Sequence, residues 1–429
     1  MPTVRTARLA NGLTAVLIEV PPSHQVLVSL MVRAGARFDP AGQAGISHFL
    51  EHLLFRGNDE FPDVSSLFES FERAGDVLNA QTGVEMTEFY QVAHPDLVAE
   101  SLHSLSAFVR TPRFADVEKE RQIILDEILY DYNEQGQLVR LDAIMAESLW
   151  GPHPLATNVT GTRETVAAFT DEQLRRHFRA QYRPDNAVLA MAGRLEADVA
   201  LPILDRTFGT WTGTDQGPNV LGNPPPGKNG RKPAMRLVED QDNQVRLMFS
   251  FPVSGYLSDE EIPLALLSSI LDDGPNSRLQ RRIREELALV YYIGCSYQAY
   301  ADAGQLDISS SVSPDKLDAF LTALFGILAE LRSEGVRADE LEAAKRRYRF
   351  DLDFGRDSLD GLLDRYAWPH LYSRVRSEDE EWERARRVQV PELSGLSMKV
   401  LASERLHVAA VGPVRGEVRR LLRKHVDRY

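Results

Sequence analysis

The sequence of 429 residues contains a single cysteine, Cys295. A disulfide framework and a cysteine-rich zinc site both need several cysteines, so the sequence excludes both. No apolar run approaches the roughly 18 residues that a membrane-spanning helix needs. The first residues also lack the apolar segment of a secretory signal peptide. We therefore expect a cytoplasmic protein that has no membrane partner.

Basic residues are too few to favour binding to nucleic acid. The 49 Lys and Arg residues face 63 Asp and Glu residues, which gives a formal net charge of −14. An excess of negative charge repels a phosphate backbone, so nucleic acid is not expected as a partner. Hydrophobic residues make up 43% of the chain and charged residues 26%, a balance that is typical of folded proteins. The length exceeds what one hydrophobic core usually supports, so we expect at least two domains.

A segment rich in proline and glycine divides the chain into two nearly equal parts. Residues 217–233 hold five Pro, four Gly and no acidic residue. Such a segment cannot continue a helix or a central strand and is typical of a semi-rigid linker. We therefore predict domains at residues 1–216 and 234–429, joined by a linker at 217–233.

Two pairs of strand-like segments indicate that the second part repeats the first. Residues 25–33 and 244–252 both begin with Gln-Val, and their starts differ by 219 positions (244 − 25 = 219). Residues 187–193 resemble residues 406–412 at the same offset, and both segments end in glycine. Short Val/Ala strands that end in glycine are common. The nearly equal lengths, the linker and the two equal offsets nevertheless favour an internal duplication.

The hydrophobic patterns of each half mix strands and helices. A hairpin is expected at residues 4–20 around Asn11-Gly12, a dipeptide that suits the positive backbone angles of a tight turn. The patterns predict strands at 26–33 and 87–93, and helices at 42–55, 64–74, 95–109, 116–133, 139–149, 315–334 and 338–353. Because strands are grouped apart from runs of helices, the sequence predicts an α+β fold. We expect two homologous α+β domains, each with a mixed or antiparallel sheet packed with helices.

The segment His48-Phe49-Leu50-Glu51-His52 is a candidate metal site. Residues four apart share one face of a helix, so His48 and His52 can present two imidazoles to one ion. Glu51 lies at the edge of that face, where it can contact a metal-bound water without binding the metal. In zinc hydrolases three protein ligands leave one position for water, and a neighbouring carboxylate accepts the proton of that water.

The third ligand must come from another part of the chain. Glu120 and Glu127 are seven residues apart on one predicted helical face, and Ile123 and Ile124 lie close to that face. A carboxylate flanked by apolar residues is less often a freely solvated charge, so either glutamate is a candidate. The alternative is a surface helix with two unrelated histidines. The apolar residues around the motif indicate a buried helix and favour a metal site.

The order His-x-x-Glu-His resembles the inverted zinc motif of the pitrilysin, insulin-degrading enzyme and mitochondrial processing peptidase superfamily, the inverzincins. The resemblance extends over the whole chain. Its other parts are residues 9–13, 35–39, 79–82 followed by Thr87 and Tyr90, Glu120-Arg121 with Glu127, and 182–186.

The resemblance implies roles for individual residues. It implies that His48, His52 and Glu127 bind Zn2+, that Glu51 is the general base, and that Glu120 is a carboxylate that supports the site. It also implies that a peptide substrate adds as a strand beside Asn79, Ala80, Gln81 and Thr82.

A pair of residues in the second half would grip the substrate near the scissile bond. Arg284 and Tyr291 have the spacing of seven that this superfamily uses for that purpose. Tyr292 follows directly, so which tyrosine faces the substrate stays open. The second half contains no His-x-x-Glu-His, so the first half alone would carry the metal.

These inferences predict a zinc-dependent endopeptidase that hydrolyses peptides or unfolded polypeptides. The resemblance implies a clamshell chamber of which this chain forms half, and therefore a partner. Because the chain carries both the zinc motif and an Arg–Tyr pair, a homodimer is favoured, and a heterodimer with a zinc-less relative is the alternative. Two other functions stay open: a non-catalytic scaffold subunit of a heteromeric complex, and a metal-dependent hydrolase of a non-peptide amide.

Overall fold

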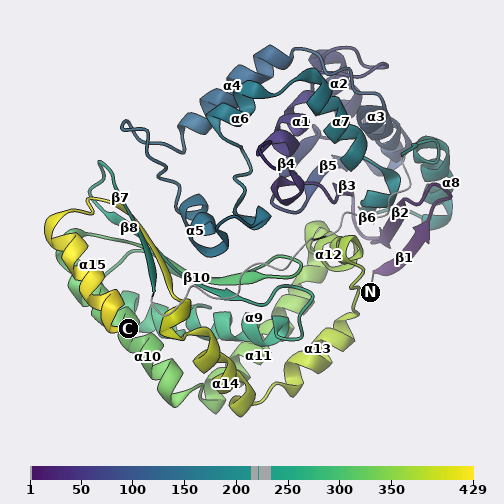
Figure 1. The fold of residues 1–429 in the computed structure, drawn as a ribbon. Coiled ribbons are helices and arrows are strands. Elements are labelled where there is room, and N and C mark those ends of the chain that lie inside the picture. The colour runs from purple at the N-terminus through teal and green to yellow at the C-terminus, as the bar shows by residue number, and fades with distance from the viewer. Residues whose placement is uncertain (1, 214–220, 222–232) are drawn as a thin grey trace. The chain divides into compact units, whose positions relative to one another are not determined.

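The computed structural model describes residues 2–213, 221 and 233–429 (Figure 1). Contacts divide the chain into two compact units, each built around its own sheet. The first consists of Met1–Leu129, Thr157–Val220 and Asp353–Val375, and the second of Tyr130–Ala156, Leu221–Leu352 and Arg376–Tyr429. Of the predicted linker at 217–233, all residues except Leu221 and Pro233 lie outside the described residues.

The sheet of the first unit has six strands among the described residues, in the order β1-β2-β6-β3-β5-β4. The strands are β1 (Thr3–Arg8), β2 (Thr14–Glu19), β3 (Val26–Val32), β4 (Asn79–Thr82), β5 (Thr87–Ala93) and β6 (Ala187–Gly193). Only β2 and β6 pair in parallel; the other neighbours are antiparallel. Strands β1 and β2 form the predicted hairpin, with Gly12 at φ +94 in its turn. Every residue of β3 and β6 is buried, as in a strand that is covered on both faces.

Helices surround this sheet. They are α1 (Ile46–Leu54), α2 (Val64–Glu72), α3 (Val98–Arg110), α4 (Val117–Leu129), α6 (Arg163–Ala168), α7 (Asp171–Gln181), α8 (Ala197–Phe208) and α12 (Leu359–Tyr366), with the short turns η1 (Ala36–Phe38) and η8 (Trp368–Tyr372). Helix α4 ends four residues before the predicted limit of 133. The side chain of Asn133 accepts hydrogen bonds from the amides of Gln135 and Gln137, and this local turn competes with a helix.

The sheet of the second unit repeats the strand order of the first. Its order, β7-β11-β8-β10-β9, matches β2-β6-β3-β5-β4, and β7 and β11 are again the parallel pair. The strands are β7 (Ala234–Glu239), β8 (Val245–Val253), β9 (Ile293–Ala299), β10 (Gly304–Val312) and β11 (His407–Gly412). The register repeats as well, because Val26 pairs with Ala93 and Val245 pairs with Val312, 219 positions further on.

The helices of the second unit follow the same sequence offset. Helices α10 (Leu317–Glu334) and α15 (Gly416–Arg428) begin 219 residues after α3 and α8. The remaining helices are α5 (Leu141–Trp150), α9 (Glu261–Leu271), the π-helix η5 (Gln280–Glu286), α11 (Ala338–Phe354), α13 (Glu378–Arg387) and α14 (Val390–Val400). The predicted α+β class is confirmed, and the repeated order and register support the duplication.

One helix of each half packs on the sheet of the other half. Helix α5 comes from the first half of the chain but contacts β7, β8 and β11, where the Ser148 hydroxyl lies 2.8 Å from His407 Nδ1. Its counterpart α12 comes from the second half and contacts β3 and β6. The predicted boundaries of the homologous domains, residues 1–216 and 234–429, stay a prediction. In space, α5 belongs to the second unit and α12 to the first, so each half of the chain contributes one helix to the other unit. Hydrophobic periodicity identifies a buried face but not the sheet that buries it.

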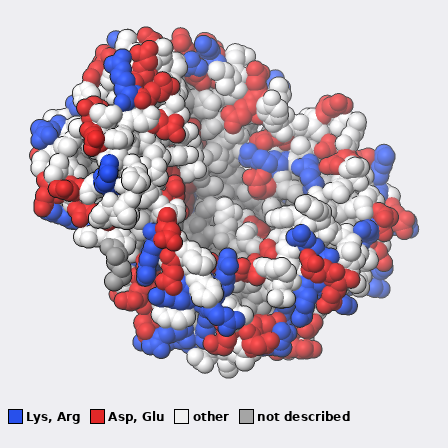
Figure 2. Space-filling view, turned by 180° about the vertical axis from the view of Figure 1, so that it is seen from behind, with Lys and Arg blue, Asp and Glu red and all other residues white. Residues whose placement is uncertain are grey.

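Charge is distributed over the surface. On the face drawn in Figure 2, acidic and basic side chains are interspersed, so the negative excess is not gathered in one area of that face. None of the described helices combines the length and apolarity needed to cross a lipid bilayer.

Candidate metal centre

The helix that carries the histidine motif is short and is fixed at its N-terminus. Helix α1 spans nine residues, and the Asp39 carboxylate accepts hydrogen bonds from Gly45 N at 2.7 Å, Ser47 N at 3.2 Å and Ser47 Oγ at 2.6 Å. Gly45 has φ +88, and a Cβ there would lie 2.6 Å from the Cα of Gly161. Only glycine allows this backbone conformation together with this close approach. Gly45 therefore marks the start of α1.

Packing orients the two histidines. Ile46, Phe49, Leu50, Leu53 and Leu54 on α1 are fully buried. The 3.6-residue period then places His48 and His52 together on the remaining face. Their rings form an edge-on pair, with centroids 4.7 Å apart.

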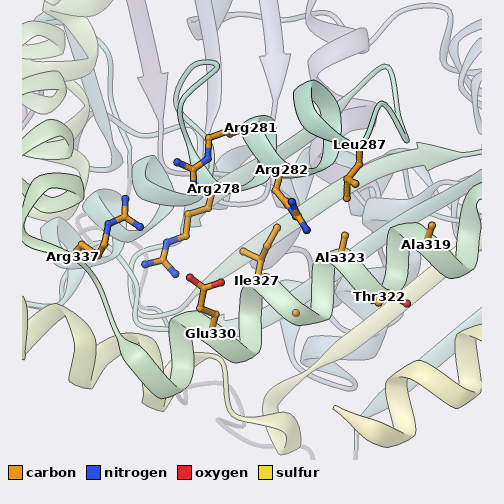
Figure 3. Close-up of a pocket in the computed structure, with 11 residues that line it drawn as sticks. Arg278, Arg281, Arg282, Leu287, Ala319, Thr322, Ala323, Ile327, Glu330 and Arg337 are labelled. Atoms are coloured by element: carbon orange, nitrogen blue, oxygen red, sulfur yellow. The ribbon is translucent and has the colours of Figure 1, made fainter.

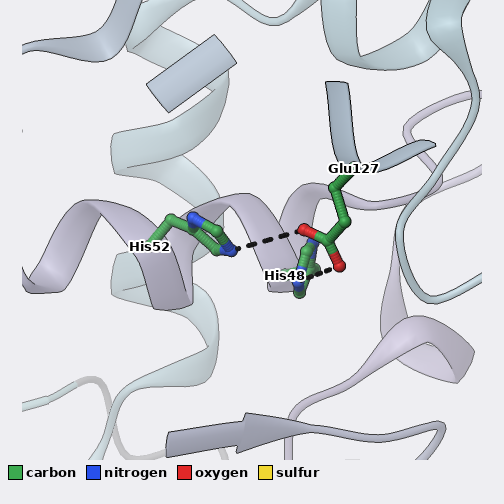
Figure 4. Close-up of side chains that lie close together, drawn as sticks. All are labelled: His48, His52 and Glu127. Carbon is green, nitrogen blue, oxygen red and sulfur yellow. Dashed lines mark ion pairs between the residues drawn. The ribbon is translucent and has the colours of Figure 1, made fainter. Parts of the chain in front are cut away.

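Glu127 on α4 meets both histidines (Figure 4). Its Oε1 lies 3.8 Å from His48 Nε2, and its Oε2 lies 3.8 Å from His52 Nε2. One ligand atom of each residue lies within 4.8 Å of the others. Ligands about 2.0 Å from one ion at tetrahedral angles are about 3.3 Å apart. Two imidazole nitrogens and one carboxylate with this spacing fit a zinc ion, after a small closure of the three side chains.

Glu120 lies behind His52. Its Oε2 is 3.0 Å from His52 Nδ1, and its other oxygen forms an ion pair with Arg56. Glu120 is only 3% exposed, so its charge is held by these two partners. A carboxylate on Nδ1 fixes the ring and leaves Nε2 toward Glu127, which is the usual arrangement behind a metal-binding histidine.

Glu51 is held by Thr82. The Thr82 hydroxyl donates to Glu51 Oε2 at 2.5 Å. Burial raises the pKa of Glu51, whereas the hydrogen bond from Thr82 and the nearby His52 lower it, and Glu127 raises it further. The sequence analysis placed Thr82 only in the substrate strand and missed this contact. The signal available in the sequence was a hydroxyl residue at the end of the segment 79–82, beside which the resemblance places the substrate.

The predicted substrate strand is an edge of the sheet. Among the residues that the structure describes, strand β4 pairs only with β5, and the side chains of Asn79 and Gln81 are exposed. Its counterpart in the second unit, β9, is capped by side chains. There Asp272 accepts from the amide of Cys295 at 2.9 Å, and Gln280 donates to the carbonyl of Ile293 at 2.7 Å. Backbone groups of β9 are thus already occupied.

The predicted grip residues lie in the second unit. Arg284 is on η5, and its guanidinium carbon lies 5.8 Å from the ring centroid of Tyr291. Tyr291 is 90% exposed and Tyr292 is 56% exposed, so both rings can meet a partner molecule. The two residues of the pair are brought together, and the choice between the tyrosines stays open.

A cavity of about 490 Å³ lies between η5 and α10 (Figure 3). Arginines line it, but carboxylates already neutralise them. Arg278 pairs with Glu340 at 2.8 Å, and Arg282 pairs with Glu286 at 2.8 Å. This charge balance does not favour an anionic ligand, and the candidate metal centre lies on other elements.

Two segments of the chain match known families. Residues 14–163 match the family described as insulinase (peptidase family M16). Residues 168–348 match the family described as the peptidase M16 inactive domain. The chain is also 26% identical over 414 residues to an "uncharacterized zinc protease" of Rickettsia bellii, and the match covers 95% of this chain and 97% of that protein.

Solved structures share the fold. A protease from Helicobacter pylori superposes with a TM-score of 0.88 at 17% identity, over 96% of this chain and 100% of that one. The periplasmic protease PqqL from Escherichia coli gives a TM-score of 0.78 at 19% identity, and the match covers 99% of this chain but 50% of PqqL.

Proposed function

Because this chain belongs to the insulinase (M16) peptidase superfamily, we propose that it is a zinc-dependent endopeptidase that acts on peptides or unfolded polypeptides. The observation that carries the proposal is the convergence of His48 Nε2, His52 Nε2 and the Glu127 carboxylate beside the half-buried Glu51. All four residues are present, which argues against a purely scaffolding subunit.

The residues of the centre have separate tasks. His48, His52 and Glu127 would hold Zn2+, and Glu120 would keep the His52 ring in place through Nδ1. Zinc, when bound, supplies a Lewis acid, which polarises the scissile carbonyl and lowers the pKa of a water molecule. Glu51 accepts the proton of the attacking water and passes it to the leaving amine. Because the Thr82 hydroxyl donates to Oε2, the other oxygen of the Glu51 carboxylate, Oε1, would accept the proton.

The open edge of β4 would hold the substrate. An extended peptide adds to a sheet edge by main-chain hydrogen bonds, which place little demand on its sequence. Folded proteins do not offer such a strand, so peptides and unfolded chains are the favoured substrates. A hydrolase of small non-peptide amides would not need this edge.

We also propose that the working form is a homodimer that encloses a chamber. The match to half of PqqL supports a second, equivalent half. In this arrangement Arg284 and Tyr291 of one copy would steady the scissile carbonyl and the developing oxyanion at the other copy's centre.

The test is to measure metal content and peptidase activity in wild type and in Glu51→Gln. Glutamine keeps an oxygen for the Thr82 hydroxyl but cannot accept the proton. We expect about one zinc per chain in both proteins, and a loss of activity of about 10²–10⁴-fold or more in the variant. Glu69→Gln, an exposed change on α2, is the matched control and should cleave a quenched flexible peptide like wild type.

Two results would count against the proposal. A wild-type protein that binds no metal would restore the scaffold interpretation. A wild-type protein that binds zinc but cleaves peptides only after a zinc-less relative is added would replace the homodimer by a heterodimer.

A further inference from the structure

The turn between β4 and β5 is tied to η1 by its main chain. The amide of Ala36 donates to the carbonyl of Gly83 at 3.2 Å, and the amide of Arg37 donates to the carbonyl of Val84 at 2.8 Å. A Cβ on Gly35 would lie 2.5 Å from the Gly83 carbonyl oxygen, so the two backbones touch. Thr82, which holds Glu51, directly precedes this turn.

The tip of the turn carries a buried carboxylate that accepts hydrogen bonds from Arg37 and Tyr372. Glu85 is 6% exposed, and Arg37 Nη1 donates to its Oε1 at 2.6 Å. The Tyr372 hydroxyl donates to its Oε2 at 3.1 Å. A buried carboxylate that accepts from a guanidinium and a hydroxyl holds its position more firmly than a surface ion pair.

Tyr372 comes from the far end of the sequence and is itself fixed. It ends η8, in the segment Asp353–Val375 that belongs to the first unit although the residues on both sides of it belong to the second. The Arg33 guanidinium lies 5.3 Å from the Tyr372 ring centroid and donates to the carbonyl of Leu371 at 3.2 Å. The Trp368 ring packs on Tyr372 at 4.8 Å between centroids. The hydroxyl is therefore a well-placed donor.

We propose that Tyr372 is a positioning residue for the metal centre. Its hydroxyl holds Glu85, the turn 83–86 transmits that position to Thr82, and Thr82 orients Glu51. The claim about Glu51 rests on the proposed peptidase function, whereas the claim about the turn does not.

Only a short turn separates Glu85 from Thr82. Glu85 and Thr82 are three residues apart in a turn closed by the hydrogen bond from Gly83 N to Met86 O at 2.8 Å. A shift of the tip therefore displaces the Thr82 hydroxyl, and a misplaced general base loses rate steeply with distance. Loss of the Tyr372 hydroxyl removes one donor and leaves the buried Arg37–Glu85 pair intact.

The experiment compares wild type with Tyr372→Phe. Amide exchange measured by mass spectrometry should be about tenfold faster in peptides that cover residues 79–90, with or without added zinc. Zinc content should not change. Turnover of a quenched peptide, kcat, should fall about tenfold, with KM changed less than about threefold.

The matched control is Tyr429→Phe, which removes a tyrosine hydroxyl bond to the carbonyl of Leu401 in the second unit. It should leave kcat and the exchange of residues 79–90 as in wild type. A second comparison places Tyr372→Phe in a Thr82→Val background. If Tyr372 acts through Thr82, the Tyr372→Phe substitution should lower kcat by less than about twofold in the Thr82→Val background.

The outcomes separate the two proposals. Unchanged exchange at residues 79–90 would overturn the role of Tyr372, and so would an undiminished tenfold effect in the Thr82→Val background. If wild type cleaves no peptide, the peptidase proposal fails and the exchange result alone decides whether Tyr372 holds the turn.

Discussion

Glu120 shows how a single buried charge can orient a side chain of the candidate metal centre. It is 3% exposed and sits between His52 Nδ1 and Arg56. A buried carboxylate without these partners would cost several kcal/mol. With them, the carboxylate selects one orientation of the His52 ring. The other glutamate of the helix, Glu127, stays partly exposed and lies 3.8 Å from the Nε2 atoms of both histidines.

His407 provides a test of burial at a single residue of the second unit. It is 1% exposed, and its Nδ1 lies 2.8 Å from the Ser148 hydroxyl. Burial, with a smaller effect of Arg236, lowers its pKa from 6.5 to about 4. Between these two values the unfolded chain binds a proton that the native protein does not bind. The contribution of His407 to stability is therefore present above pH 6.5 and is lost as the pH falls toward 4.

We expect the free-energy difference between wild type and His407→Gln to depend on pH. From pH 7 to pH 5, wild type should lose about 2 kcal/mol relative to the variant. Urea unfolding of both proteins at the two pH values measures this difference. An equal difference at pH 7 and pH 5 would show that the pKa of His407 is the same in the folded protein as in the unfolded chain.

At the scale of elements, two equivalent glycines end two equivalent strands. Gly193 closes β6 at φ +141, and a Cβ there would lie 2.1 Å from the carbonyl oxygen of Gln25. Gly412 closes β11 at φ +132, and a Cβ there would lie 2.3 Å from the carbonyl oxygen of Gln244. The same close approach of two backbone segments is thus present at the equivalent position in both sheets.

Alanine at either glycine should destabilise the fold by more than about 3 kcal/mol, because it adds a clash with a fixed carbonyl to the cost of a positive φ. Gly42→Ala is the control, since Gly42 has φ +77 but nothing within 4 Å of the added Cβ. It should cost only about 1–2 kcal/mol. Equal losses for all three variants in urea unfolding would mean that the sheets shift to accept the methyl group.

The two edge strands have diverged although the sheets have the same order. Strand β4 keeps an open edge beside Thr82 and Glu51, whereas Asp272 and Gln280 cap β9. A capped edge resists the addition of another chain. This difference at the element scale is consistent with the His-x-x-Glu-His motif being present in one half only.

At the scale of the whole molecule, the exchanged helices make each half dependent on the other. Helix α12 covers β3 and β6 with Leu362 and Leu363, which are 1% and 2% exposed. A chain of residues 1–216 lacks this cover. It would expose apolar strand surface that the full protein buries.

We expect residues 1–216 expressed alone to bind the dye ANS and to unfold without a cooperative transition. Co-expression with residues 217–429 should give a complex that unfolds cooperatively, because both exchanged helices are then present. Calorimetry and ANS fluorescence on the two preparations provide the comparison. Cooperative unfolding of residues 1–216 by themselves would show that the exchanged helix adds little stability.

The sequence by itself determined the local and chemical features of this protein. The period of 3.6 placed His48 and His52 on one face, the Asn11-Gly12 turn predicted the first hairpin, and the offset of 219 predicted a repeated sheet. These features depend on residues near each other in the chain or on a pattern that occurs twice. The same reasoning named Glu120 and Glu127 as candidate ligands, since a helix brings residues seven apart to one side.

Only the tertiary structure decided which distant residues meet. Three features join segments that are 31 to more than 200 residues apart. They are the hydrogen bond from Thr82 to Glu51, the hydrogen bond from Tyr372 to Glu85, and the exchange of α5 and α12 between the two halves. A threonine in an edge strand or a tyrosine after a short helix has no periodicity that identifies its partner. Such contacts depend on how strands pair and which sheet buries each helix. Packing of the whole chain sets these choices, because the free energy of burial depends on apolar area and not on the identity of the surface that covers it.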